Sequence, residues 1–516
     1  MKKNDHRAII RVVIATGISS VVTQLLTIRE FLTQFQGNEI VIALILFNWL
    51  ILGGLGTLLA RIAARRAQSA SADRLALMSL VLSGLAMLQI HAIRQLRDIV
   101  FIPGSSVGFY PTWCFSFWVI APYCLLLGFV LPYSLFIIRG NQADYPVARI
   151  YITDNIGDIT GGALFSFALV YLVSPLQAIL LAHIPLLGAV YLLPPVSSRQ
   201  RPLVVLSLGF LVMVMVAGVA LENRSLTPTE GQLVYYRETR YGRIEVHKDQ
   251  EQYTLFEDGV PVSSSQNQSL AEEIIHYPLA GLDSTNHVLL ISAQGGIMGE
   301  LKKYNIKTVD YIELDPAVTD VQFRFGLIDD IPGLNIIHQD ARAYLSRTEK
   351  IYDAIIVNLP EPGTFQINRF YTHRFFEMAR KHLATGGMLS FSMQGYDNYL
   401  AEPQRQKLSS LFNTVKAHFK NVVLLPGQKV FFLCSDGPLT VDIPAVLERR
   451  NIATAYISSF FVGNLTRQRI QHLNQGMDPS TPVNTDTAPY LMGLMFSQWF
   501  AKFKTSPLGF FLVWAI

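Results

Sequence analysis

The chain of 516 residues is poor in charge and in cysteine, and both shortages exclude classes of protein. Charged residues make up 16% of the sequence, with 42 Lys and Arg against 38 Asp and Glu. No basic stripe with interleaved aromatic residues occurs, so we expect no nucleic-acid partner. The three cysteines, Cys114, Cys124 and Cys434, have neither a disulfide-framework nor a metal-ligand spacing. The histidines form no metal-ligand pattern, so we expect no metal site. No serine lies in a nucleophile elbow, which argues against a serine hydrolase.

Apolar residues, by contrast, are abundant at 50% of the chain, and their excess is concentrated before residue 223. Each of seven apolar stretches is close to the ~20 residues that a helix needs to cross a bilayer. They cover residues 8–28, 39–60, 74–93, 113–138, 150–173, 175–195 and 202–221. The first is not a cleaved signal peptide, because it has no small-residue cleavage pattern and further spans follow. The sequence therefore predicts an α-helical multi-span membrane bundle over 1–222, in contact with the lipid bilayer.

Lysine and arginine residues predict the orientation of this bundle. Most of those between the stretches fall on the same side as the amino terminus, which we therefore expect to be cytoplasmic in a multi-pass membrane protein. Seven complete spans would place the rest of the chain outside the cytoplasm. However, the fifth stretch begins with Asp154 and Asp158, which are costly in lipid. Either this stretch is re-entrant or its carboxylates face a packed bundle interior, and the side of the second half stays open.

The second half of the chain has the texture of water-soluble domains. Short alternating runs over 231–284 predict a small antiparallel β-sheet followed by a helix. Apolar strands that alternate with helical segments predict an α/β core over 285–436. A helical appendage over 437–487 and an apolar carboxyl-terminal tail over 488–516 follow. The tail is either a membrane-docking segment or the start of a further span.

Within the α/β core, each expected strand ends on a polar or glycine-rich loop. The strand 287–292 runs into the loop 293–296, and the next strand ends at Glu313, roughly 20 residues beyond the glycines. A third strand ends at Asp340 and a fourth at Asn358. In a doubly wound, Rossmann-like sheet a ligand lies across these carboxyl ends, where a carboxylate can bind both ribose hydroxyls. The pattern therefore predicts an adenosine-type ligand.

Several strings in this half resemble those of one enzyme family. They are Tyr311–Ala317, Asp340–Arg342, Tyr352–Pro362, Asn368–Thr372 and Asn484–Asp486. In position and spacing they resemble the spermidine synthase family of polyamine aminopropyltransferases, and especially its bacterial branch in which the domain follows a multi-span membrane region. The resemblance extends over essentially the whole chain. It implies a fold of the S-adenosylmethionine-dependent methyltransferase type, and transfer of the aminopropyl group of decarboxylated S-adenosylmethionine to a diamine such as putrescine.

The resemblance also implies roles for individual residues on the side of the donor. Gly295 and Gly296 let the backbone approach the donor, Glu313 holds the ribose, and Asp340 with Ala341 meets the adenine. Alternatively, these residues bind no ligand. The glycines would then form only a tight turn, and the two carboxylates would be solvated acids at the ends of strands. The donor is a co-substrate, so no permanently bound cofactor is expected.

On the side of the acceptor, the resemblance places the loop 358–361 against the attacking amine and has Tyr371 close the pocket. The sequence departs from the family here. Asn358 stands where the family has its base aspartate, and an amide has no useful basicity, so Glu361 would have to act as the base. Leu270 and Ala271 replace a Tyr-His pair, and the glycine loop is one residue short.

These departures leave three functions open. The first is a membrane-anchored aminopropyltransferase-like enzyme with a small amine substrate, which we also expect to form a homodimer. The second is a methyltransferase-like enzyme that uses S-adenosylmethionine itself. The third is a non-catalytic sensor or transport module that binds an amine or a nucleoside.

Overall fold

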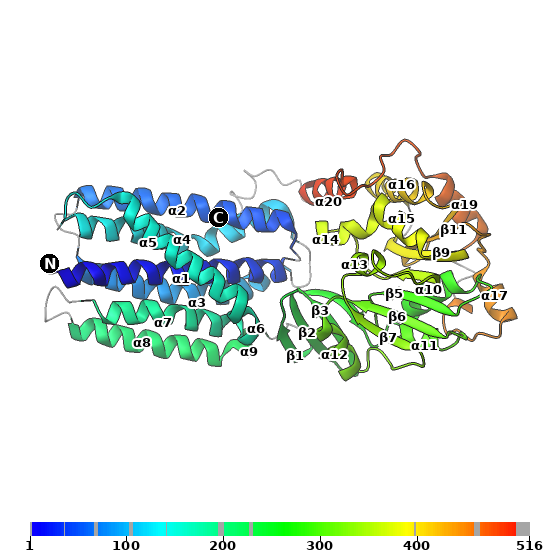
Figure 1. Cartoon of the computed structure of the whole chain (residues 1–516), viewed down its shortest axis with the longest axis horizontal. Helices are drawn as coiled ribbons and strands as arrows, with labels where there is room; N and C mark the ends of the chain where they lie inside the picture. The colour runs from blue at the N-terminus through cyan, green and yellow to red at the C-terminus, as the bar shows by residue number, and fades with distance from the viewer. Residues whose placement is uncertain are drawn as a thin grey trace. The chain divides into compact units, whose positions relative to one another are not determined.

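The structure is a computed structural model, and it describes residues 3–35, 37–66, 71–102, 107–140, 142–193, 201–226, 231–396, 399–458 and 465–501. By its internal contacts the chain divides into two compact units, Met1–Arg243 and Ile244–Ile516. Both units are drawn in Figure 1.

The first unit consists mainly of helices that lie side by side (Figure 1). They are α1 (Lys3–Gln34), α2 (Glu39–Arg66), α3 (Ala72–Val100), α4 (Phe109–Arg139), α5 (Val147–Leu164), a π-helical turn (Phe165–Leu169), α6 (Val170–Leu172), α7 (Pro175–Tyr191), α8 (Arg201–Ala220) and α9 (Glu222–Ser225). Five segments are long and apolar enough to cross a membrane: His6–Gln34, Glu39–Ala63, Ala72–Val100, Phe109–Arg139 and Val147–Leu172. The sixth and seventh stretches expected from the sequence coincide with shorter apolar helices, Pro175–Tyr191 and Val204–Ala220.

Glycines bring the backbones of α2 and α4 into direct contact. A Cβ atom added at Gly56 would lie 2.2 Å from the carbonyl oxygen of Leu125, and one added at Gly128 would lie 2.1 Å from that of Gly53. No side chain fits at such distances, so these two positions require glycine. Small residues serve the same purpose wherever apolar helices must associate closely.

One end of the same unit contains a buried charge network. Glu30 on α1 is fully buried, and its Oε1 lies 2.6 Å from Nη2 of Arg94 on α3. Arg243 also pairs with Glu30, and its Nε donates to Oε1 of Glu238 at 2.7 Å. A buried charge is tolerated only when it is paired and hydrogen-bonded, so this network fixes the packing of α1 against α3.

Strand β1 (Gln232–Glu238) still belongs to the first unit. The second unit begins with small antiparallel strands, in which β2 (Arg243–Asp249) pairs with β3 (Gln252–Glu257), and β3 pairs with β4 (Val260–Ser264). Helix α10 (Gln268–Leu279) follows.

The remainder is a seven-stranded sheet in the order β10-β11-β9-β8-β5-β6-β7. The strands are β5 (His287–Ile291), β6 (Thr308–Glu313), β7 (Leu334–His338), β8 (Tyr352–Val357), β9 (Leu383–Gln394), β10 (Asn421–Leu425) and β11 (Lys429–Ser435). Strands β5 to β9 are parallel, while β11 runs antiparallel to both β9 and β10. The strand order reverses beside β5, which pairs with β6 on one side and β8 on the other. The doubly wound fold expected from the sequence is confirmed.

Helices connect and cover these strands (Figure 1). They are α11 (Ile297–Leu301), α12 (Pro316–Arg324), α13 (Ala341–Leu345), α14 (Phe365–Asn368), a 3-10 turn (Arg369–Tyr371), α15 (His373–Lys381), α16 (Glu402–Lys416), α17 (Ile443–Arg449), α19 (Arg467–Gln475) and α20 (Tyr490–Ala501). Of the apolar tail expected over 488–516, the part up to residue 501 contains α20, and the rest lies outside the described residues.

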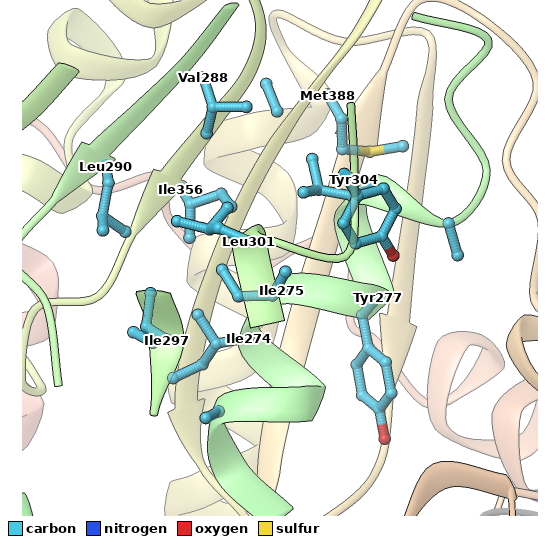
Figure 2. Packing of buried hydrophobic residues seen from close by; sticks show 14 of the residues in the cluster. Ile274, Ile275, Tyr277, Val288, Leu290, Ile297, Leu301, Tyr304, Ile356 and Met388 are labelled. Atoms are coloured by element: carbon cyan, nitrogen blue, oxygen red, sulfur yellow. The ribbon is translucent and has the colours of Figure 1, made fainter. Parts of the chain in front are cut away.

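Alternate residues of the central strands contribute to two separate buried clusters. Val288 and Leu290 of β5 pack with α10 and α11 in one cluster, as Figure 2 shows. Leu289 and Ile291 belong to the other, with the aromatic residues of α15. Successive side chains of a strand point to opposite faces, so the two clusters cover both faces of the sheet. The ends of the strands are therefore left as the place for a ligand.

We predict that Gly56→Ala destabilises the helical unit, because the new methyl group would press on the Leu125 carbonyl and force α2 and α4 apart. The expected loss is about 1–3 kcal/mol of unfolding free energy, the usual cost of overpacking. Thermal unfolding of the full chain in detergent measures it. Gly54→Ala is the matched control, since nothing lies within 4 Å of a Cβ atom there. Equal stability of the two variants would contradict the contact.

Candidate active site

The carboxyl ends of β5, β6 and β8 are held next to one another by backbone hydrogen bonds. The amide of Ser292 donates to the Ile312 carbonyl at 3.0 Å, and the amide of Asn358 donates to the Ile291 carbonyl at 2.9 Å. Both bonds continue the strand ladders into the loops. The loops that start at Ser292, Glu313 and Asn358, which the sequence assigned to one ligand site, therefore begin at one edge of the sheet.

In the glycine loop, both glycines are required by contacts within the protein. A Cβ atom at Gly295 would lie 2.0 Å from the carbonyl oxygen of Ser264, and the Gly295 amide donates to the Ser263 hydroxyl at 2.8 Å. Gly296 has φ +85° at the start of α11, and a Cβ atom there would lie 3.1 Å from Cβ of Ala271. The loop is thus packed against the end of β4 and the start of α10. The contact of these glycines with a donor stays a prediction.

Glu313 stands at the end of β6, half-buried and hydrogen-bonded to its own loop. Its Oε1 accepts from the Leu314 amide at 2.7 Å, and the Ser292 hydroxyl also hydrogen-bonds to its carboxylate. Burial raises the pKa of the Glu313 carboxyl. Ser292 itself has φ +60°, a conformation uncommon outside glycine. A strained residue directly beside the ribose-binding candidate is the kind of feature that clusters at functional sites.

A second acidic residue, Glu257 at the end of β3, lies close to Glu313. Burial and the neighbouring charge of Glu313 raise the pKa of Glu257 to about 8, with smaller contributions from Asp258 and Asp315. Carboxylates that repel one another are stabilised by a bound cation, which offsets both the burial and the repulsion. This part of the edge therefore suits a positively charged ligand.

Asp340 and Ala341 begin α13. Oδ1 of Asp340 accepts from the Ala343 amide at 2.9 Å and caps the helix, while Oδ2 pairs with Arg369. Ala341 is buried. The carboxylate is therefore occupied by the protein in this structure, and its contact with an adenine stays a prediction.

The loop after β8 is anchored through Glu361. Its Oε2 lies 2.9 Å from Nζ of Lys407, whose side chain is 2% exposed, and its Oε1 accepts from the Gln394 amide at 2.9 Å. Both carboxylate oxygens thus already have partners within the protein. This disfavours the role of base that the resemblance implies for Glu361. The side chain of Asn358 is half-buried.

Tyr371 supports the same loop from below. The residue is fully buried, and its hydroxyl is shared between the carbonyls of Leu359 at 3.1 Å and Pro360 at 3.0 Å. Its ring packs edge-on against Phe391. The sequence assigned to Tyr371 the closure of the pocket, and in the structure it positions the loop that carries Asn358 and Glu361.

The sequence did not predict the buried positions of two charged side chains, Glu272 and Lys407. Glu272 is fully buried and accepts the amides of Ala455, Tyr456 and Ile457 at 2.6–3.0 Å. Lys407 was not considered, although a lysine in the apolar surroundings of Leu408 and Leu411 signals a buried ion pair. Among the described residues, no cluster of His, Cys, Asp and Glu could hold a metal ion.

Comparison with known proteins shows what the second half of the chain is similar to. Residues 267–441 match the spermine/spermidine synthase domain. A polyamine aminopropyltransferase of Oceanobacillus iheyensis is 24% identical over 382 residues, which cover 70% of this chain and 73% of that protein. Polyamine aminopropyltransferase 2 of Aquifex aeolicus is 24% identical over 318 residues, which cover 57% and 63% of the two chains.

Solved structures include a spermidine synthase from Thermotoga maritima that is similar at 15% identity and a TM-score of 0.39. That similarity covers 48% of this chain and 89% of the solved one.

We predict that Glu257 makes the stability of the chain depend on pH. Its pKa rises from 4.5 to about 8 on folding, so the folded state holds the proton more tightly and stability falls as pH rises between these values. Glu257→Gln should flatten this fall, by about 1.4 kcal/mol for each pKa unit removed. Thermal unfolding at pH 5, 7 and 9 measures it. Glu251→Gln, at an exposed turn of the same sheet, is the control, and identical pH profiles for both variants would refute the assignment.

Proposed function

We propose that this chain, a member of a spermidine synthase-like family, transfers an aminopropyl group from decarboxylated S-adenosylmethionine to an amine acceptor at the carboxyl edge of β5, β6 and β8. The observation that carries the proposal is the position of Glu313. It lies at the end of β6, beside the glycine loop and inside the segment that matches the spermine/spermidine synthase domain. The two aminopropyltransferases that are similar to the chain support the same reaction.

On the donor side, the acidic residues match the charges of the co-substrate. Decarboxylated S-adenosylmethionine carries a sulfonium and a primary ammonium and has no carboxylate. Glu313 and Glu257, whose pKa values are raised by burial, would ionise more readily beside such a dication. The charge pattern favours the decarboxylated donor over S-adenosylmethionine, whose carboxylate would add a further negative charge.

The transfer itself is an in-line displacement in which the chain mainly positions the reactants. The acceptor nitrogen forms a bond to the propyl carbon next to sulfur, and the electron pair of the breaking C–S bond stays on sulfur. The products are methylthioadenosine, a neutral thioether, and the extended amine. The amine must also lose one proton to a base. The loop 358–361, held by Tyr371 and Lys407, would lie next to that step.

The helical unit would anchor this activity to a membrane. Five helices of sufficient length and apolarity, together with the small-residue contacts between α2 and α4, support a membrane-spanning bundle. The excess of lysine and arginine on one side supports a cytoplasmic amino terminus. Assembly as a homodimer stays a prediction.

We predict that the full chain in detergent releases methylthioadenosine from decarboxylated S-adenosylmethionine when an amine acceptor is present. Glu313→Gln should weaken donor binding at least about tenfold, since a hydrogen bond to a charged group contributes about 1.5–3 kcal/mol. Chromatographic detection of methylthioadenosine and titration of the donor measure the two effects. Glu251→Gln is the control. No release with any acceptor would refute the proposed function, and unchanged donor affinity would remove the ribose assignment.

A further inference from the structure

A lysine and a glutamate that the family comparison does not assign lie at the acceptor edge of the sheet. Lys429 is the first residue of β11, and it stands opposite Gln394, the last residue of β9. The amide of that same Gln394 donates to Glu361 at 2.9 Å. Lys429 therefore lies at the edge where the loop after β8 meets the sheet.

Glu273 reaches this edge from helix α10. The first turn of the helix contacts the glycine loop, where Ala271 lies 3.1 Å from a Cβ atom placed at Gly296. Half a turn further on, Oε1 of Glu273 lies 3.2 Å from a Cβ atom placed at Gly427, two residues before Lys429. One helix thus connects the donor loop with the start of β11, and Glu273 stands between them.

One oxygen of the Glu273 carboxylate has an unmet hydrogen bond. Oε1 accepts from the Tyr277 hydroxyl at 3.1 Å, while Oε2 is buried and has no partner among the residues that the structure describes. A buried acceptor without a partner destabilises the folded state, because it has lost its hydrogen bonds to water. A donor group supplied by a ligand would remove this cost.

The positive and negative side chains at this edge do not suit a diamine acceptor. Glu361 and Lys407 neutralise one another at 2.9 Å. Glu272 uses both of its oxygens for the backbone amides of residues 455–457. One carboxylate with an oxygen lacking a partner, Glu273, and one ammonium, Lys429, are left, and no ion pair joins these two in the described part of the chain. A diamine such as putrescine brings two positive charges and needs two carboxylates, because buried charges must be paired. Lys429 would repel its second ammonium.

We propose that the acceptor of this site is a zwitterionic amine, with Glu273 receiving its amino group and Lys429 its carboxylate. The inference rests on the proposed function and narrows its substrate class. When the acceptor nitrogen bonds to the propyl carbon and the C–S pair stays on sulfur, the proton lost by the nitrogen passes to Oε2 of Glu273. Glu273 thereby supplies the base that Asn358 cannot be.

The surroundings of Glu273 suit this step. The charged and titratable groups that act on it are Tyr277 and Glu272 from its own helix and Lys429 from β11, and Glu361 acts on Lys429 as well. Burial raises the pKa of Glu273 to about 7, and burial lowers the pKa of Lys429. Because a base acts only in its ionised form, kcat/KM should rise with pH through about 7.

The decisive experiment compares putrescine with 4-aminobutyrate, a chain of similar length in which a carboxylate replaces one amine. Methylthioadenosine release by the full chain in detergent is followed with each acceptor. We expect kcat/KM to favour 4-aminobutyrate by at least about tenfold, and Lys429→Gln to abolish the preference by raising KM for the zwitterion alone. Lys420→Gln, at an exposed position, is the control. A preference for putrescine, or an unchanged ratio in Lys429→Gln, would overturn the proposal.

A second variant separates the base from a structural role. Glu273→Gln should lower kcat and remove the rise of kcat/KM near pH 7, while donor affinity, which depends on Glu313, stays unchanged. Retention of the pH-dependent rise would exclude Glu273 as the base. If no acceptor is converted at all, the proposed function fails. The acceptor class is then decided by thermal stabilisation with 4-aminobutyrate against putrescine, and equal or no stabilisation would refute it.

Discussion

The pairing of β5 with both β6 and β8 is the constraint on which the site depends. Hydrogen bonds from Ser292 to Ile312 and from Asn358 to Ile291 continue the two ladders beyond the strand ends. The origin of each loop is therefore fixed by main-chain atoms and not by the side chains that follow. A substitution at the edge leaves the strand ends in place, because the hydrogen bonds between the strands join backbone atoms and do not involve the side chain. An asparagine at position 358 is thus compatible with intact loop geometry.

The two sides of the edge differ in charge, and the difference fits the proposed aminopropyl transfer. On the donor side, Glu257 and Glu313 crowd together and resist ionisation. On the proposed acceptor side, Glu361 is neutralised by Lys407, and the carboxylate of Glu273 and the ammonium of Lys429 carry opposite charges. In the proposed reaction the donor arrives as a cation and leaves as a neutral thioether, so an acidic donor side would favour binding of the reactant over the product. The opposite charges on the other side would favour the proposed acceptor, which carries no net charge.

Local patterns predicted most of the fold, whereas contacts distant in sequence could not be predicted. The alternating clusters of β5 and the glycine loop follow from residues near one another. The ion pair of Glu361 joins residues 46 positions apart, and the burial of Tyr371 beneath its loop depends on Phe391. A glycine in a sequence can also be required for either of two reasons, a contact with a ligand or close packing within the protein. Gly295 fits a donor contact and a packing contact equally well, and only the 2.0 Å approach to Ser264 reveals the second.

The strings that carry the family resemblance are mostly the scaffold of the acceptor loop. The Asn484 side chain donates to Asn368 at 3.0 Å and to the Tyr371 carbonyl at 2.9 Å, and Arg342 pairs with Asp486 at 2.9 Å. Three strings far apart in sequence thus meet below the loop that Tyr371 supports. Their presence preserves the position of the loop, and says little about what the loop binds. Departures at positions 270, 271 and 358 therefore leave the doubly wound fold and the loop position intact, and the specificity of the proposed site depends on which charges are left unpaired at the edge.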